Sequence, residues 1–204
     1  TMLYAQKLLD ENRFDDAINV LADFSPSATS ENIQAYISLC QLSIYSVPSY
    51  DIILPSFFSL RKMLFKLLRT MDSKVKGFQA LQRFTRGLHL LCQVSDLEAF
   101  NLIEMASYAA QSALRYSDVI PADFLFFKAG TLLKRLNQFG PAILFLNPFI
   151  DIDEVIKSGD VSNSNQIDHI PYQETDIPTS FCLRKNHSIK SDITQETNDW
   201  ILEQ

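Results

Sequence analysis

Apolar residues recur along most of the chain at the three- and four-residue spacing of amphipathic helices. The predicted helices cover 2–11, 14–24, a segment that begins at Ser30, 55–71, 74–93, 95–116, 121–136 and 139–150. Apart from the break before Pro55, the links between them are two to five residues long. Such short links make consecutive helices pack antiparallel, as helical hairpins.

Two of the predicted turns share the pattern Asn-x-Phe-x-x-Ala-Ile. One copy begins at Asn12 in "ENRFDDAINVL" and the other at Asn137 in "LNQFGPAILFL". Asn tolerates the left-handed conformation that ends a helix, the aromatic ring fills the gap, and the Ala lets two helices approach. The pattern resembles the turn of a tetratricopeptide repeat, which has Gly-x-Tyr-x-x-Ala in this register. The copies lie 125 positions apart, so we predict an all-α fold whose antiparallel hairpins form an irregular, tetratricopeptide-like solenoid.

The helical period stops after the last of these helices. Residues 152–190 are polar and contain Gly159, Pro171 and Pro178. We expect this tail to be partly mobile around 158–168 and then to lie extended over the helices. Its predicted anchors are apolar side chains: Ile170, Tyr172, Ile177 and Phe181. The predicted organisation is a solenoid over 1–151, an extended tail over 152–190 and a short C-terminal helix over 191–204, docked by Trp200 and Ile201.

Composition agrees with a folded helical chain. Of the 204 residues, 47% are hydrophobic and 21% charged, which is ordinary for a soluble domain. The low count of five Gly argues against a β-rich or nucleotide-binding fold. Three widely spaced Cys indicate a reducing compartment rather than a disulfide framework. No apolar run is long enough to span a membrane, and Thr1 before Met2 suggests a segment of a longer protein.

The sequence offers little for catalysis or metal binding. It has no Gly-x-Ser-x-Gly motif and no glycine-rich phosphate loop. Cys182 and His187, with His169 nearby, lack the paired spacing of a zinc site. His89 and Cys92 are interpreted as a half-buried helix residue beside a core thiol. We therefore predict no enzyme activity, no metal, no cofactor and no small-molecule substrate.

Charge is distributed unevenly along the chain. The net charge is −6 with a pI near 5.0, so nucleic acid is not an expected partner. Cations nevertheless gather in one stretch, and the candidate partner-binding residues are Arg61, Lys62, Lys66, Arg69, Lys76, Arg83 and Arg86. From residue 151 onward, acidic residues outnumber basic ones.

Three interpretations of this basic face remain open. It can be the solvated side of a core helix, a surface for an acidic protein or for the acidic tail of this chain, or a contact to anionic lipid. The lipid interpretation makes the chain a membrane- or coat-adaptor module. Lipid binding requires the Leu- and Met-rich side of the predicted helix 55–71 to be exposed, whereas packing in a helical hairpin would bury that side.

Several motifs occur in order in the second half of the chain. They are "SDVIPADFLFFKAG", "NQFGPAILFLNPF", "FLNPFIDIDEVIKSGD", "YQETDIP" and "NDWILEQ". Together they resemble the C-terminal region of the intraflagellar transport protein 172 family over about residues 88–202. The first 87 residues match only as a generic helical repeat.

The resemblance implies a non-catalytic scaffold segment of an intraflagellar transport B-complex subunit that is required for cilium assembly. It implies other intraflagellar transport proteins as partners, in the B complex and also in the A complex. It places the chain in the cytoplasm, at the cilium or flagellum and the basal body. Because the chain stops just past Trp200, we expect it to lack the U-box-like end domain of the family.

Overall fold

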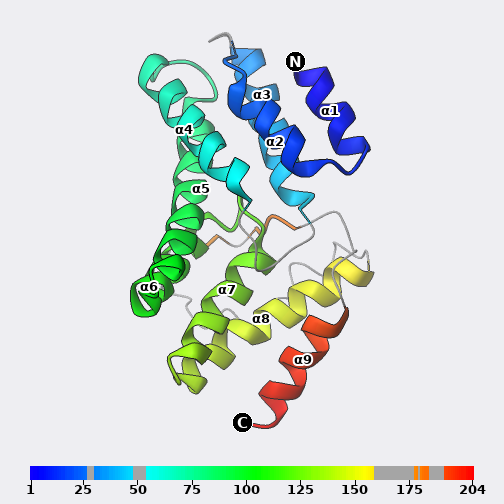
Figure 1. Cartoon of the computed structure of the whole chain (residues 1–204), viewed down its shortest axis with the longest axis vertical. Coiled ribbons are helices and arrows are strands. Elements are labelled where there is room, and N and C mark those ends of the chain that lie inside the picture. Colours follow the sequence, from blue (N-terminus) through cyan, green and yellow to red (C-terminus); the bar gives the residue numbers. More distant parts are fainter. Residues whose placement is uncertain (27–29, 48–53, 159–176, 179, 184–190) are drawn as a thin grey trace.

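All regular secondary structure in the described part of the chain is helical (Figure 1). The computed structural model describes residues 1–26, 30–47, 54–158, 177–178, 180–183 and 191–204. The elements are α1 (Met2–Asp10), α2 (Phe14–Asp23), α3 (Ser30–Tyr45), α4 (Pro55–Thr70), α5 (Phe78–Ala99), α6 (Ile103–Ala113), the 3₁₀ turn η1 (Leu114–Tyr116), α7 (Ala122–Arg135), α8 (Phe139–Ser158) and α9 (Ser191–Leu202). The predicted all-α fold is confirmed.

Three hairpins, α1–α2, α5–α6 and α7–α8, are closed by the same turn. The residue after the helix cap is an Asn with positive φ in each: 59° at Asn12, 56° at Asn101 and 58° at Asn137. The next N–H donates to the carbonyl five residues earlier, and the three bonds join Arg13 to Leu8 (2.8 Å), Leu102 to Leu97 (2.8 Å) and Gln138 to Leu133 (3.0 Å). This is the Schellman arrangement, which satisfies carbonyls at a helix end.

The turn also explains why the same interval separates the Asn from a small residue in all three hairpins. Five positions after each Asn stands an Ala with no exposed surface, and these are Ala17, Ala106 and Ala142. A small side chain there lets the second helix lie close to the first. The left-handed conformation predicted for Asn12 and Asn137 is confirmed, and Asn101 is a third copy.

The hairpins are stacked irregularly. Helix α4 packs on α2 and α5, while α3 makes smaller contacts with α1, α2 and α5. From α4 onward each helix packs on the next, and α7 with α8 forms the most extensive pair. The helix α3 therefore stands beside the stack rather than closing a hairpin with α4.

Several helix boundaries differ from the prediction, among them the start of α5 at Phe78 rather than 74 and that of α6 at Ile103 rather than 95. Helix α5 continues to Ala99, and the turn lies at Asn101 rather than between residues 93 and 95. Helix α8 continues to Ser158, eight residues past the predicted end at 150. Asp153 is buried within this extension. Its carboxylate is compensated there, because Thr194 Oγ1 donates to Oδ2 at 2.6 Å and Lys157 forms an ion pair with it.

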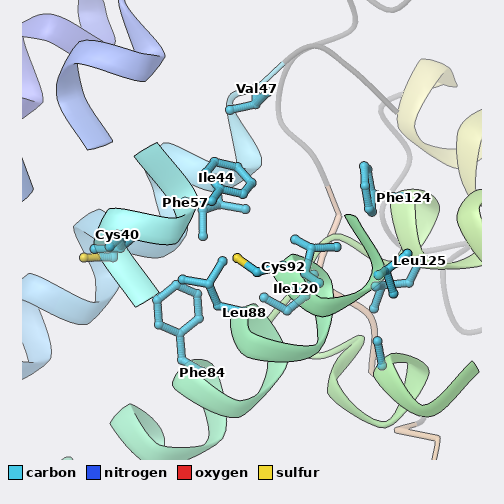
Figure 2. Packing of buried hydrophobic residues seen from close by; sticks show 14 of the residues in the cluster. Cys40, Ile44, Val47, Phe57, Phe84, Leu88, Cys92, Ile120, Phe124 and Leu125 are labelled. Atoms are coloured by element: carbon cyan, nitrogen blue, oxygen red, sulfur yellow. The ribbon is translucent and has the colours of Figure 1, made fainter. Parts of the chain in front are cut away.

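One continuous apolar core joins the two ends of the stack. Figure 2 shows Cys40 and Ile44 of α3 and Phe57 of α4 close to Phe84 and Leu88 of α5. Cys92 of α5 then lies beside Ile120, and Phe124 and Leu125 of α7 continue the cluster. Because the core is not divided, the described helices form one packed unit.

A short piece of the tail is fixed across the middle of this unit (Figure 1). The Cys182 N–H donates to the Ser117 carbonyl at 2.7 Å, and its own carbonyl accepts from Ala122 N–H at 2.9 Å. Phe181 packs edge-to-face on Phe126, with ring centres 5.8 Å apart, and Ile177 also packs against the core. The predicted anchoring by Ile177 and Phe181 is confirmed, whereas Ile170, Tyr172 and residues 159–168 lie outside the described residues.

Candidate partner-binding surface

The described residues offer no metal-binding group, and two of their three cysteine thiols are buried. No group of three or more His, Cys, Asp and Glu within them could hold a metal ion. Cys40 and Cys92 are fully buried; burial raises the pKa of the Cys92 thiol to about 12 and that of Cys40 above its ordinary value as well. A thiol is a nucleophile only when deprotonated. His169 and His187 lie outside the described residues.

His89 has the environment predicted for it, half buried on α5 above the core. Its ring meets Phe65 edge-on, with centres 5.6 Å apart. Burial lowers the pKa of His89 below 6.5, and the nearby Arg61 guanidinium lowers it further. The neutral ring therefore acts as a packing group between α4 and α5.

Among the seven predicted partner-binding cations, Arg83 has a structural role. Its guanidinium donates to both carboxylate oxygens of Asp118 at 2.7 Å and to the carbonyl of Arg115 at 2.6 Å. It also lies over the ring of Tyr116, 5.2 Å from the centroid. These contacts tie α5 to the segment after η1, so Arg83 is oriented toward its own chain.

Arg61 is also held by its own chain, although less tightly. Its guanidinium lies 5.2 Å from the ring centre of Phe58 and 3.8 Å from Asp96 Oδ2. The side chain is 24% exposed. Arg61 therefore connects the start of α4 to the end of α5.

The other cations face solvent. Lys62, Lys66 and Arg69 are exposed on α4, Arg86 is exposed on α5, and Lys76 is exposed in the turn before α5. On α4 the opposite side is buried, with Leu60, Leu64 and Leu67 all less than 5% exposed. The structure thus brings Lys62, Lys66 and Arg69 together as one stripe, which we call the α4 basic stripe. None of these three forms an ion pair with a described residue.

A second exposed patch is apolar and was not predicted from the sequence. It lies at the α5–α6 turn and along α6, and its members are Phe100, Leu102, Met105 and Tyr108. Phe100 is 78% exposed and Tyr108 63%. Clustered exposed apolar side chains are typical of protein contact surfaces. The sequence analysis did not single out these residues, and it placed the start of this helix at 95 rather than at Ile103.

Two ion pairs, one largely buried and one exposed, meet at Glu98. Glu98 at the end of α5 accepts from Lys128 Nζ at 2.9 Å and from Arg135 Nη1 at 3.0 Å, both on α7. Lys128 is only 7% exposed, so its charge is compensated where solvent is scarce. These contacts join two hairpins.

Within the described residues, no helix combines the length and the apolar composition that crossing a bilayer requires. No protein-family model matches the chain. Curated proteins do match it, over nearly its whole length. The chain is 27% identical over 206 residues to the intraflagellar transport protein 172 homolog of Mus musculus. It is 25% identical over 207 residues to intraflagellar transport protein osm-1 of Caenorhabditis elegans and 24% over 207 residues to intraflagellar transport protein 172 of Chlamydomonas reinhardtii.

The chain is similar to a segment of intraflagellar transport protein 172. Each match covers 98% of this chain and 12% of the relative, so the chain spans about an eighth of the length of these proteins. The resemblance read from the second half of the sequence is thereby confirmed. Its limits were too narrow, because the similarity to intraflagellar transport protein 172 also includes the first 87 residues.

Proposed function

We propose that this chain is a non-catalytic scaffold segment of an intraflagellar transport B-complex subunit and contributes to cilium assembly through protein contacts. Its similarity to intraflagellar transport protein 172 in animals and in Chlamydomonas reinhardtii supports the transport role. The burial of the Cys40 and Cys92 thiols and the all-helical stack support a structural role rather than a catalytic one. The proposed locations are the cytoplasm, the cilium or flagellum, and the basal body.

The proposed contact surface is the α4 basic stripe, with the exposed Arg86 and Lys76 as further candidate residues. The observation that carries this choice is the division of the cations: Arg61 and Arg83 have acidic partners in their own chain, whereas Lys62, Lys66 and Arg69 have none among the described residues. Exposed cations on a rigid helix attract an acidic surface and help to orient it. The proposed partners are acidic faces of other intraflagellar transport proteins, of the B complex first and of the A complex second.

The test is a pull-down of purified B-complex and A-complex subunits, each detected individually. Lys62, Lys66 and Arg69 are replaced by Gln together, and the 204-residue chain is the bait. We expect at least about tenfold weaker capture, corresponding to about 1.4 kcal/mol, and a weaker dependence on salt. Capture that is equal for the wild type and the triple variant would reject the surface.

A matched control removes the same charge elsewhere. Lys7, Arg13 and Arg135 are exposed and pair with Glu11, Asp16 and Glu98 respectively. Replacing these three by Gln changes the net charge equally and costs little stability, because exposed ion pairs contribute at most about 1 kcal/mol each. Capture by this control is expected to equal that of the wild type.

The lipid-binding adaptor remains the alternative to be tested. The structure disfavours it, because the Leu side of α4 is buried and cannot insert into a bilayer. Flotation with vesicles containing anionic lipid separates the two functions. Flotation that is lost in the α4 variant, without any loss of protein capture, would favour the adaptor.

A further inference from the structure

The exposed face of α9 carries a row of acids. Glu196, Asp199 and Glu203 are all exposed, and Asp192 stands one turn before them. At 3.6 residues per turn these four lie within about 60° of the helix circumference. Glu203 follows the last helical residue but keeps the helical hydrogen bond, since its N–H donates to the Asp199 carbonyl at 3.2 Å. We call Glu196, Asp199 and Glu203 the α9 acidic stripe.

Residues beside and behind the acidic stripe hold α9 against α7 and α8. Thr194 donates to the buried carboxylate of Asp153. Trp200 packs edge-to-face on Phe139 with ring centres 5.8 Å apart, and Lys134 Nζ lies 4.3 Å from its ring centre. These contacts set the rotation of α9 about its axis, so its acids are directed away from the molecule.

The two stripes have matching spacing. On α4 the intervals are four residues from Lys62 to Lys66 and three from Lys66 to Arg69. On α9, counted from the C-terminal end, the intervals are four residues from Glu203 to Asp199 and three from Asp199 to Glu196. Each stripe is about 10 Å long at 1.5 Å per residue. An antiparallel arrangement therefore places every cation opposite an acid.

One molecule cannot bring its own stripes together. Helices α4 and α9 make no contact, and Figure 1 shows them toward opposite ends of the longest axis. In the described part of the chain, neither the α4 basic stripe nor the α9 acidic stripe has an ion-pair partner.

We propose that the α9 acidic stripe of one copy docks antiparallel on the α4 basic stripe of a second copy, with Lys62 opposite Glu203, Lys66 opposite Asp199 and Arg69 opposite Glu196. This inference rests on the proposed function, because it names a partner for the same basic stripe. The contact joins two different surfaces, so it is heterologous and repeats from copy to copy. Phe65, 38% exposed beside the basic stripe, and Leu202, 77% exposed beside the acidic one, add apolar area.

The physical character of the contact follows from its composition. Exposed ion pairs are screened by salt, so the association is weak, reversible and favoured at low ionic strength. It becomes effective where copies are held at high local concentration.

The experiment is sedimentation of the 204-residue chain at millimolar concentration, in low and in high salt. We expect association at low salt and dissociation at high salt. Lys62→Glu, Lys66→Glu and Arg69→Glu in one variant, and Glu196→Lys, Asp199→Lys and Glu203→Lys in another, are each expected to weaken the association at least about tenfold. All six side chains are exposed, so helical content measured by circular dichroism is expected to remain that of the wild type.

Mixing the two variants is the decisive step. The first variant has two acidic stripes and the second has two basic ones, so neither associates with itself. Together they restore both contacts, one with the native signs and one with the signs exchanged. A chain that carries all six substitutions is also expected to self-associate.

Several results would overturn the proposal. They are a monomeric wild-type chain at low salt, association that survives either reversal, and variants that fail to associate when mixed. The proposed function is tested by a different measurement, the capture of other transport proteins, so it can fail or hold independently of the self-association. A monomeric chain whose capture of those proteins still depends on Lys62, Lys66 and Arg69 would refute only the self-association.

Discussion

Gly130 of α7 lies directly against the side chain of Leu146 in α8. A β-carbon added at Gly130 would stand 2.5 Å from Leu146 Cγ and 3.2 Å from the carbonyl oxygen of Ala142. The first distance is far inside van der Waals contact. The two helices therefore approach as closely as they do because position 130 has no side chain.

We predict that Gly130→Ala destabilises the fold by up to about 2 kcal/mol. Overpacking costs about 1–3 kcal/mol, and the gain of about 1 kcal/mol in helix propensity offsets only part of it. The free energy of unfolding in urea, with an unchanged slope against denaturant, is the measurement.

Gly140 provides the matched control for this substitution. It is the second residue of α8, and a β-carbon there would meet nothing within 4 Å. Gly140→Ala is expected to stabilise the chain by up to about 1 kcal/mol. Equal effects at the two positions would show that α7 and α8 are not in close contact at Gly130.

The sequence predicted the turns better than the lengths of the helices. Asn12 and Asn137 were identified from an Asn followed by Phe and Ala, whereas Asn101 is followed by Ile103 and Ala106 and was missed. The structure shows why the aromatic ring was too strict a requirement. All three turns have an Asn with positive φ and a buried Ala. The position two residues after the Asn accepts either Phe or Ile.

We predict that Asn101→Ala lowers the free energy of unfolding by about 1 kcal/mol, while Asn101→Gly leaves it unchanged or raises it slightly. A β-carbon makes the left-handed conformation costly, and the short polar side chain of Asn reduces that cost. Denaturant unfolding of both variants is the measurement. Asn19→Ala, on the exposed side of α2, is the control and is expected to have no destabilising effect.

Long-range partners account for the largest errors in the sequence analysis. Residues from 152 onward were assigned to a polar tail, but α8 continues to Ser158, and Thr194, 41 positions after Asp153, donates to the buried carboxylate of Asp153. The sequence analysis also gave no sign that Arg83 pairs with Asp118, 35 positions away. A partner-binding role for Arg83 stays a prediction. A helical period locates a charged residue on one side of its own helix, whereas its partner depends on how the helices are stacked.

The final prediction concerns His89 and pH. Burial first, and then the charge of Arg61, lower the pKa of His89 in the folded chain, with Asp96 acting in the opposite direction. The unfolded chain therefore binds a proton near pH 6.5 while the folded chain still does not. Stability falls as pH decreases through that value. Above about pH 7.5 both states are neutral at this position and the effect is absent.

We expect His89→Gln to flatten this dependence: between pH 7.5 and 5.5 the free energy of unfolding should fall less in the variant than in the wild type. Arg61→Gln is expected to have a smaller effect in the same direction, because it removes the second cause of the pKa shift but leaves the burial. Unfolding in urea at several pH values, with the ring titrated by NMR, makes both comparisons. A His89 ring that titrates at or above 6.5 in the folded chain would contradict its placement between α4 and α5, because a half-buried imidazole beside a guanidinium resists protonation.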